Sequence, residues 1–174
     1  IGTSIGGLIG SASDSIISNV AFEGHVSSYC PAQIGGVIGA ISRSKIQNVS
    51  ASTTVNVSDT SCYSVAAGGI AGSANDSSIA NSFTDSSISF SGQTVGDCNG
   101  GGCPAGGGLV GTSSNNGSLG LQISNSYAAG SMSVTSTSSN RSYSVGGMVG
   151  TVVWADIAIV DSFSNITTSI ANCV

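Results

Sequence analysis

Gly6-Gly7-Leu8-Ile9-Gly10 is the stretch that decides how this chain folds, because it recurs four more times. The later copies are Gly35-Gly36-Val37-Ile38-Gly39, Gly68-Gly69-Ile70-Ala71-Gly72, Gly107-Gly108-Leu109-Val110-Gly111 and Gly146-Gly147-Met148-Val149-Gly150. Successive copies begin 29, 33, 39 and 39 residues apart. A cassette of this length, repeated five times, is typical of a solenoid in which each repeat contacts only its neighbours.

Two further elements follow the glycine motif in each copy. The first ends in Asn or Asp, and the second alternates apolar and polar residues, as in Thr53-Thr54-Val55-Asn56-Val57. Alternation over four to six residues, with Gly, Ser, Thr, Val and Ile dominant, disfavours helix and predicts strands. We therefore expect an all-β parallel β-solenoid (β-helix) of about five coils with three short strands per coil. The whole chain, 1–174, forms one domain, with coils at approximately 1–34, 35–67, 68–106, 107–145 and 146–174.

The recurrent Asn is expected to stack from coil to coil as a hydrogen-bonded ladder. This ladder comprises Asn19, Asn48, Asn81, Asn125 and Asp161. We expect it to be buried, and Asp161 to interrupt its amide bonding. Three aromatic residues, Phe83, Tyr127 and Phe163, lie two positions after the ladder residue of their copies. Counting by two places them on the same face as the preceding isoleucines, so a stacked ladder inside the coil is expected; a sugar-binding platform is the alternative.

Composition excludes several classes of function. The chain has 174 residues with 26 Gly, 3 basic and 8 acidic residues and a net charge of −5, which does not suit nucleic-acid binding. It lacks an apolar run of about 18 residues for a membrane span. His25 is the only histidine. Among the carboxylates only Asp14 and Asp76 share a register, about 10 Å apart at two coils' distance, too far for a retaining glycosidase pair. We expect no catalytic residues, no metal site and no cofactor.

The five cysteines lack zinc-site spacing and predict disulfides formed in an oxidising compartment. The interpretation favoured by the spacing pairs Cys30 with Cys62 across adjacent coils and Cys98 with Cys103 within a turn. Cys173 is then left for a neighbouring subunit. A head-to-tail bond from Cys173 to the next Cys30 is an alternative that still leaves one thiol unpaired, so the connectivity stays open.

Six Asn-x-Ser/Thr sequons occur in the chain. Asn48 belongs to the ladder and is expected to be buried and therefore unmodified. The other five are predicted N-glycosylation sites because they fall in turns or near strand ends. They are Asn56, Asn75, Asn116, Asn140 and Asn165.

Gly-Leu-Ile-Gly at 7–10 and Gly-Leu-Val-Gly at 108–111 resemble the GLUG-motif repeats of large secreted and surface proteins. The Ile-x-Asn-Ser-[Phe/Tyr] continuation in the third and fourth copies strengthens the resemblance, which covers most of the chain. The resemblance implies a β-solenoid stalk or an adhesin-type surface module, and it supplies no catalytic residues.

The two ends of the chain show no polar cap, which predicts open coil edges that can pair with another chain. We expect a non-enzymatic structural subunit of an extracellular, glycosylated filament or stalk that stacks head-to-tail. Its partners are other copies of itself and covalent glycans, without nucleic acid or a membrane span. The alternative is an adhesin module that binds cell-surface glycans. A polysaccharide-active β-helix enzyme and an ice-binding surface are weaker hypotheses.

Overall fold

The computed structural model describes residues 3–29, 32–58, 65–92, 103–114, 120–136 and 143–171. These residues form strands throughout, and all strand pairs are parallel. The strands are β1 (Ser4–Gly6), β2 (Ile9–Ser13), β3 (Ile16–Ser28), β4 (Gln33–Gly35), β5 (Ile38–Ser42), β6 (Lys45–Val57), β7 (Ala66–Gly68), β8 (Ala71–Asn75), β9 (Ser77–Ala80), β10 (Phe83–Gly92), β11 (Ala105–Gly107), β12 (Val110–Ser114), β13 (Leu121–Ser124), β14 (Tyr127–Ser136), β15 (Ser144–Gly146), β16 (Val149–Val153), β17 (Ile157–Val160) and β18 (Phe163–Ala171).

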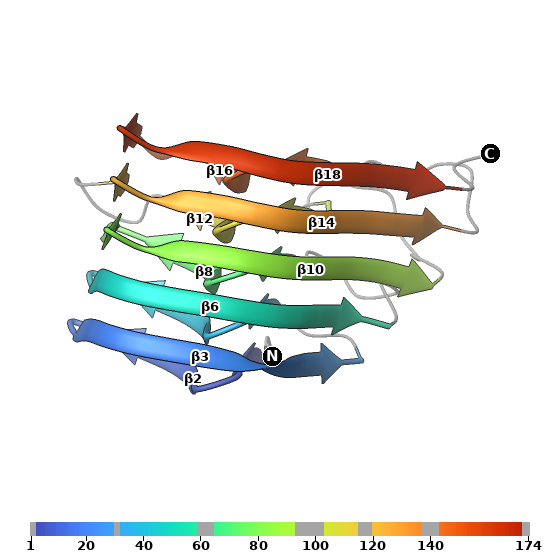
Figure 1. Ribbon diagram of the computed structural model, residues 1–174, viewed down its shortest axis with the longest axis horizontal. Coiled ribbons are helices and arrows are strands. Elements are labelled where there is room, and N and C mark those ends of the chain that lie inside the picture. Colours follow the sequence, from blue (N-terminus) through green and yellow to red (C-terminus); the bar gives the residue numbers. More distant parts are fainter. Residues whose placement is uncertain are drawn as a thin grey trace.

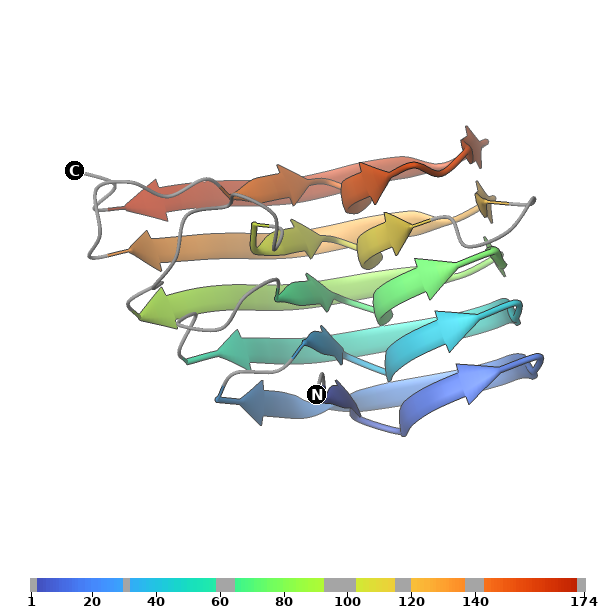
Figure 2. The same ribbon diagram turned by 180° about the vertical axis from the view of Figure 1, so that it is seen from behind.

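Five coils stack along one axis and present three parallel sheets. Strands β1-β4-β7-β11-β15 form one short-stranded sheet and β2-β5-β8-β12-β16 form another. The third, which we call the long sheet, contains β3, β6, β10, β14 and β18, together with β9, β13 and β17. Figure 1 shows the long strands in sequence order, from β3 in blue to β18 in red. Figure 2, the view from the opposite side, shows the short strands in front of the long ones. The predicted all-β parallel solenoid is confirmed.

The strands divide each coil differently from the sequence-based expectation. The glycine motif is not one strand: it spans the end of one strand, a bend and the start of the next, as in β4 and β5. The second and third predicted stretches lie on the same sheet. In coils one and two they form continuous 13-residue strands, β3 and β6, whereas in coils three to five a break separates them. Each coil therefore has two short faces and one long face.

The glycine motif is required by close approach of the backbone at the bend between the two short sheets. A Cβ on Gly39 would lie 2.5 Å from the carbonyl oxygen of Gly10 and the amide nitrogen of Ile5, both in the preceding coil. A Cβ on Gly36 would lie 2.3 Å from the carbonyl oxygen of Gly69 in the following coil. Real Cβ atoms are not found at such distances, so a side chain at either position would push neighbouring coils apart.

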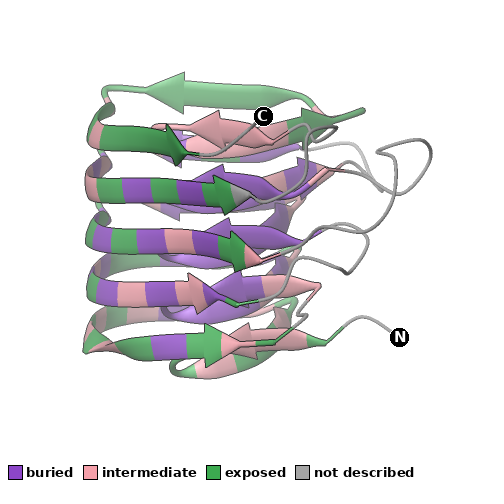
Figure 3. Cartoon of the chain, turned by 90° about the vertical axis from the view of Figure 1, so that its right-hand side faces the viewer, coloured by how far each residue is buried: buried purple, intermediate pink, exposed green. Residues whose placement is uncertain are grey.

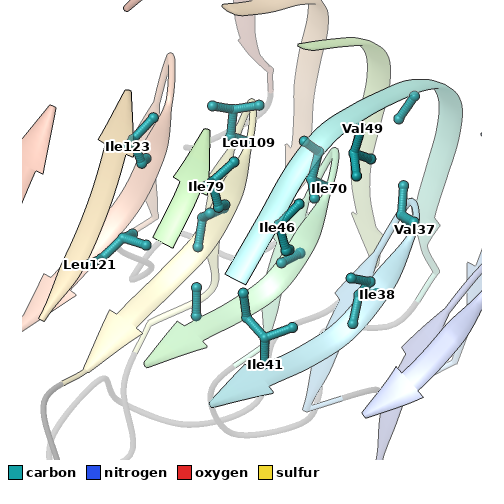
Figure 4. Close-up of a cluster of buried hydrophobic side chains, with 14 of the residues drawn as sticks. Val37, Ile38, Ile41, Ile46, Val49, Ile70, Ile79, Leu109, Leu121 and Ile123 are labelled. Atoms are coloured by element: carbon teal, nitrogen blue, oxygen red, sulfur yellow. The ribbon is translucent and has the colours of Figure 1, made fainter. Parts of the chain in front are cut away.

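The interior contains stacked aliphatic residues in two clusters. The larger lies between the long sheet and β5, β8 and β12, and includes the column Ile46, Ile79 and Ile123 together with Val37, Ile70 and Leu109 at the bend (Figure 4). The smaller, between the long sheet and the other short sheet, includes Ile34, Val55, Ile88, Phe90 and Met132. Buried and exposed residues alternate along the middle coils, while the last coil is largely exposed (Figure 3).

Candidate functional site

The aromatic residues form a stacked column, but on the outside of the long sheet. The rings of Phe83 and Tyr127 are nearly parallel with centroids 6.4 Å apart, and those of Tyr127 and Phe163 are 4.4 Å apart. Phe83 is 43% exposed and Phe163 is 64% exposed. The expected stacking is therefore present, and the expected position inside the coil is wrong. We call these three residues the aromatic column.

The reason is a left-handed residue just before each ring. Asn81, Asn125 and Asp161 have φ between 46° and 49°. A residue in this region interrupts the two-residue alternation of a strand. Ile79 points inward and Asn81 is exposed, after which Ser82 is buried and Phe83 points outward. Counting by two from Ile79 therefore predicts the wrong face of the sheet for Phe83.

The predicted ladder positions share one column, and what they have in common is backbone conformation. All five residues, Asn19, Asn48, Asn81, Asn125 and Asp161, have positive φ. Asn and Asp tolerate this conformation better than other non-glycine residues. Asn48 donates a hydrogen bond from Nδ2 to Oδ1 of Asn19 at 3.0 Å, and among the described residues this is the one amide-to-amide bond in the column. The column is exposed, so the expected burial of Asn48 is wrong.

Two columns of serine hydroxyls, which sequence reasoning missed, complete the backbone hydrogen bonding beside the left-handed residues. Ser44 Oγ donates to the carbonyl oxygen of Ser42 at 2.7 Å and accepts the N–H of Ser15 at 3.1 Å, one coil earlier. Ser77 repeats this arrangement with Asn75 and Ser44. The second column contains Ser82, Ser126 and Ser162. Ser follows Asn or Asp at every one of these positions except Ser44, which follows Arg43, and this recurrence was the available signal.

A second left-handed column carries the one ion pair among the described residues. Asp14, Arg43 and Asp76 follow one another in successive coils, each with positive φ. Arg43 lies 2.7 Å from Asp14, and both side chains are exposed. Hydrogen bonds from Arg43 and Ser13 lower the pKa of Asp14 to about 2. The arginine thus separates the two carboxylates that share this register.

Three of the predicted glycosylation sites lie in the described part of the chain. Asn165 is exposed on β18. Asn56 is half-buried on β6, and its Oδ1 accepts a hydrogen bond from Ser89 at 2.5 Å. Asn75 is half-buried at the end of β8, and its Oδ1 accepts two hydrogen bonds from Ser114, at 2.9 Å from N and 3.1 Å from Oγ. Asn116 and Asn140 lie outside the described residues.

Cys103 is disulfide-bonded. Cys30, Cys62, Cys98 and Cys173 lie outside the described residues, so the two predicted pairings and the intersubunit role of Cys173 remain predictions.

His25 is exposed on β3, with Nε2 3.5 Å from Nδ2 of Asn56. The described ranges contain no group of three or more His, Cys, Asp or Glu side chains arranged to hold a metal ion.

Two adjoining hollows lie on the outer face of the long sheet. One, of about 390 Å³, lies beneath Phe83 over β3 and β6 and is lined by Ala21, Phe22, Glu23, Ser50, Ala51, Ser52 and Phe83. The other, of about 490 Å³, crosses β3, β6, β10 and β14. Glu23 and Ser52 line both, so the two hollows adjoin, and we call them together the face groove.

The end coils leave apolar residues uncovered. Ile159 is 45% exposed, although Ile123, its partner in the same column one coil earlier, is 1% exposed. Ile170 and Ile157 are likewise exposed, while their partners Val134 and Leu121 are buried. At the opposite end Leu8 is exposed, whereas Val37 at the same bend position of the next coil is buried.

No protein-family model and no curated protein matches this chain by sequence. The described part of the chain contains no helix of the length and hydrophobicity needed to cross a membrane.

Proposed function

We propose that this chain is a non-enzymatic structural unit that stacks head-to-tail with further copies of itself into an extracellular filament or stalk. The observation that carries the proposal is the exposure of Ile159 beside the complete burial of its column partner Ile123. An identical coil placed on the open edge would bury this residue as the fifth coil buries the fourth. Unpaired strand edges with exposed aliphatic residues are also the surfaces that recruit another chain.

Gly10 supports a neighbour on the opposite edge. Its counterparts Gly39, Gly72, Gly111 and Gly150 would each drive a Cβ into the backbone of the preceding coil, at 2.5 to 2.6 Å. A Cβ on Gly10 would meet only the carbonyl oxygen of Ser4, at 3.2 Å. Among the described residues, the backbone leaves more room for a Cβ at position 10 than at its counterparts, whereas a coil packed below it would require glycine.

The serine column that contains Ser44 and Ser77 also supports a further copy of the chain as the stacking partner. Each Ser44 or Ser77 hydroxyl accepts an N–H from the coil before it. Within the described residues the Ser15 hydroxyl, at the first coil, donates to Ser13 and accepts no N–H. The corresponding position in the fifth coil is Ile157. The N–H of Leu121, its partner in the fourth coil, points to the fifth coil and donates to the carbonyl oxygen of Asp156. The N–H of Ile157 therefore points to the open edge. In a head-to-tail stack Ile157 would donate to Ser15 of the next copy.

The extracellular and glycosylated character is part of the proposal. The disulfide at Cys103 favours an oxidising compartment, and Asn165 is exposed in a sequon. Intact mass before and after enzymatic removal of N-glycans tests the modification in protein from its native source. A mass equal to that of the bare polypeptide would remove the glycan part and leave the stacking part to its own test.

Electron microscopy and sedimentation of the purified chain test stacking. Five coils at about 4.8 Å each predict an axial repeat near 24 Å. Gly10→Ala is expected to leave the monomer folded and to abolish filaments, because its methyl group would meet the backbone of the copy below. The matched control Ser52→Ala, on the lateral face, should assemble normally. If the covering coil belonged instead to a further segment of the same polypeptide, the chain alone would stay monomeric at high concentration, and the proposal would fail.

A further inference from the structure

The face groove combines one free aromatic ring face with a shelf of small residues. Phe83 pairs in register with Ser50, which pairs in turn with Ala21. Tyr127 stacks against one side of the Phe83 ring. On the other side the column continues as Ser50 and Ala21, whose short side chains leave the hollow of about 390 Å³. Phe83 therefore ends the aromatic column with a ring face turned toward an open shelf.

Polar groups continue from this shelf across the face. Glu23 and Ser52 line the shelf and also the larger hollow of about 490 Å³. Asp85 lies in the same register column as Glu23 and Ser52. The hydroxyls of Thr54, Ser87 and Ser131, in the adjacent outward column, line the opposite side. The floor includes Gly24 and Gly130, which lack side chains.

We propose that the face groove binds a neutral oligosaccharide of at least two sugar rings. The apolar C–H face of one ring would stack on Phe83, since aromatic side chains combine a large apolar surface with a directional π-face. Hydroxyls of the next sugar would donate to the carboxylates of Glu23 and Asp85, and charge-assisted hydrogen bonds of this type are the stronger ones. Both hollows fall within the size range of small-molecule sites, about 300–1,000 Å³.

Charge restricts the class of sugar. Glu23 and Asp85 both face the groove, and no Lys or Arg is among the residues that line it in the described part of the chain. Sialylated, uronic-acid or sulfated glycans would bring further negative charge to these carboxylates and are disfavoured. This site lies on the lateral face and reaches β3, the strand of the first coil. It goes beyond the stacking function and is tested separately from it.

Amide chemical-shift titration of the full chain tests the proposal, with cellotetraose, maltotetraose, mannotetraose and chitotetraose as neutral probes and tetragalacturonate as the acidic one. At least one neutral probe should give saturable shifts centred on β3, β6 and β10, and tetragalacturonate should bind at least tenfold more weakly. Phe83→Ala should weaken binding at least tenfold, Phe83→Tyr should retain it, and Glu23→Gln should weaken it several-fold. Phe163→Ala is the matched control, because it removes an exposed ring of the same column away from the shelf.

Three results would overturn the proposal. They are the absence of saturable shifts with all four neutral probes, binding that survives Phe83→Ala, and equal losses from Phe163→Ala and Phe83→Ala. Circular dichroism of each variant establishes that the fold is intact, and Phe83→Tyr distinguishes loss of the ring from loss of structure. Filament formation is measured separately on the same samples, so failure of one proposal leaves the other standing.

Discussion

Ser82 Oγ accepts the backbone N–H of Val49, one coil earlier, at 3.2 Å, and donates to the carbonyl oxygen of Ala80 at 2.8 Å. The hydroxyl replaces the carbonyl that the left-handed Asn81 turns away from the strand. Val49 is buried, so its N–H would lack a partner without this hydroxyl, whereas Ala80 is half-buried. A polar side chain is thus part of the backbone hydrogen-bonding pattern of the solenoid.

Ser82→Ala should lower the free energy of unfolding by about 1–3 kcal/mol, because a buried N–H would lose its acceptor. Denaturant unfolding measures the change. Ser52→Ala, on an exposed position of the neighbouring coil, is the matched control and should shift stability by less than about 0.5 kcal/mol. Equal effects of the two substitutions would show that the Ser82 hydroxyl is not required.

Gly39→Ala should destabilise the monomer by about 3 kcal/mol or more, since its Cβ would lie 2.5 Å from backbone atoms of the preceding coil. Gly10→Ala, at the same position of the first coil, should cost much less in the monomer. Thermal unfolding at concentrations too low for assembly compares the two. Similar losses of stability would contradict the idea that a preceding coil is what demands glycine.

The carboxyl of Asp14 should titrate with a pKa of about 2, because Arg43 and Ser13 hydrogen-bond to its ionised form. A depressed folded-state pKa contributes stability above the unfolded value near 3.8, and that contribution is lost as pH falls toward 2. The gain is small because both partners are exposed. Carbon-detected NMR titration measures the midpoint, and Arg43→Gln should return it toward the ordinary range. An unchanged midpoint in that variant would refute the pairing.

Tyr127→Ala should cost about 1–2 kcal/mol, because the ring contacts Phe83 on one side and Phe163 on the other. Tyr127→Phe keeps both contacts and should be near neutral. Chemical denaturation of the two variants measures the difference. If Phe were as damaging as Ala, the hydroxyl rather than ring stacking would matter at this position.

The repeat predicted the solenoid, the number of coils and the register of the columns, because five matching glycine motifs can stack only if equivalent residues pair. The direction of side chains after Asn81 could not be predicted by counting, since one left-handed residue reverses the alternation. The Asn column was predicted to be a ladder of hydrogen-bonded amides. Asp161 occupies the same column with the same positive φ, which indicates that the position requires a residue that tolerates the left-handed conformation. The face groove depends on a small residue at Ser50 beneath Phe83, a relationship visible only once the coils are in register.

The shared columns also affect how such a chain can change over evolutionary time. Each coil meets its neighbours through the same glycine bend, and all five have serine after one or both left-handed residues. An in-frame duplication or deletion of one repeat, 29 to 39 residues long, would therefore create an interface already compatible with the adjacent coils. Recombination between repeats could lengthen or shorten the solenoid without a new core.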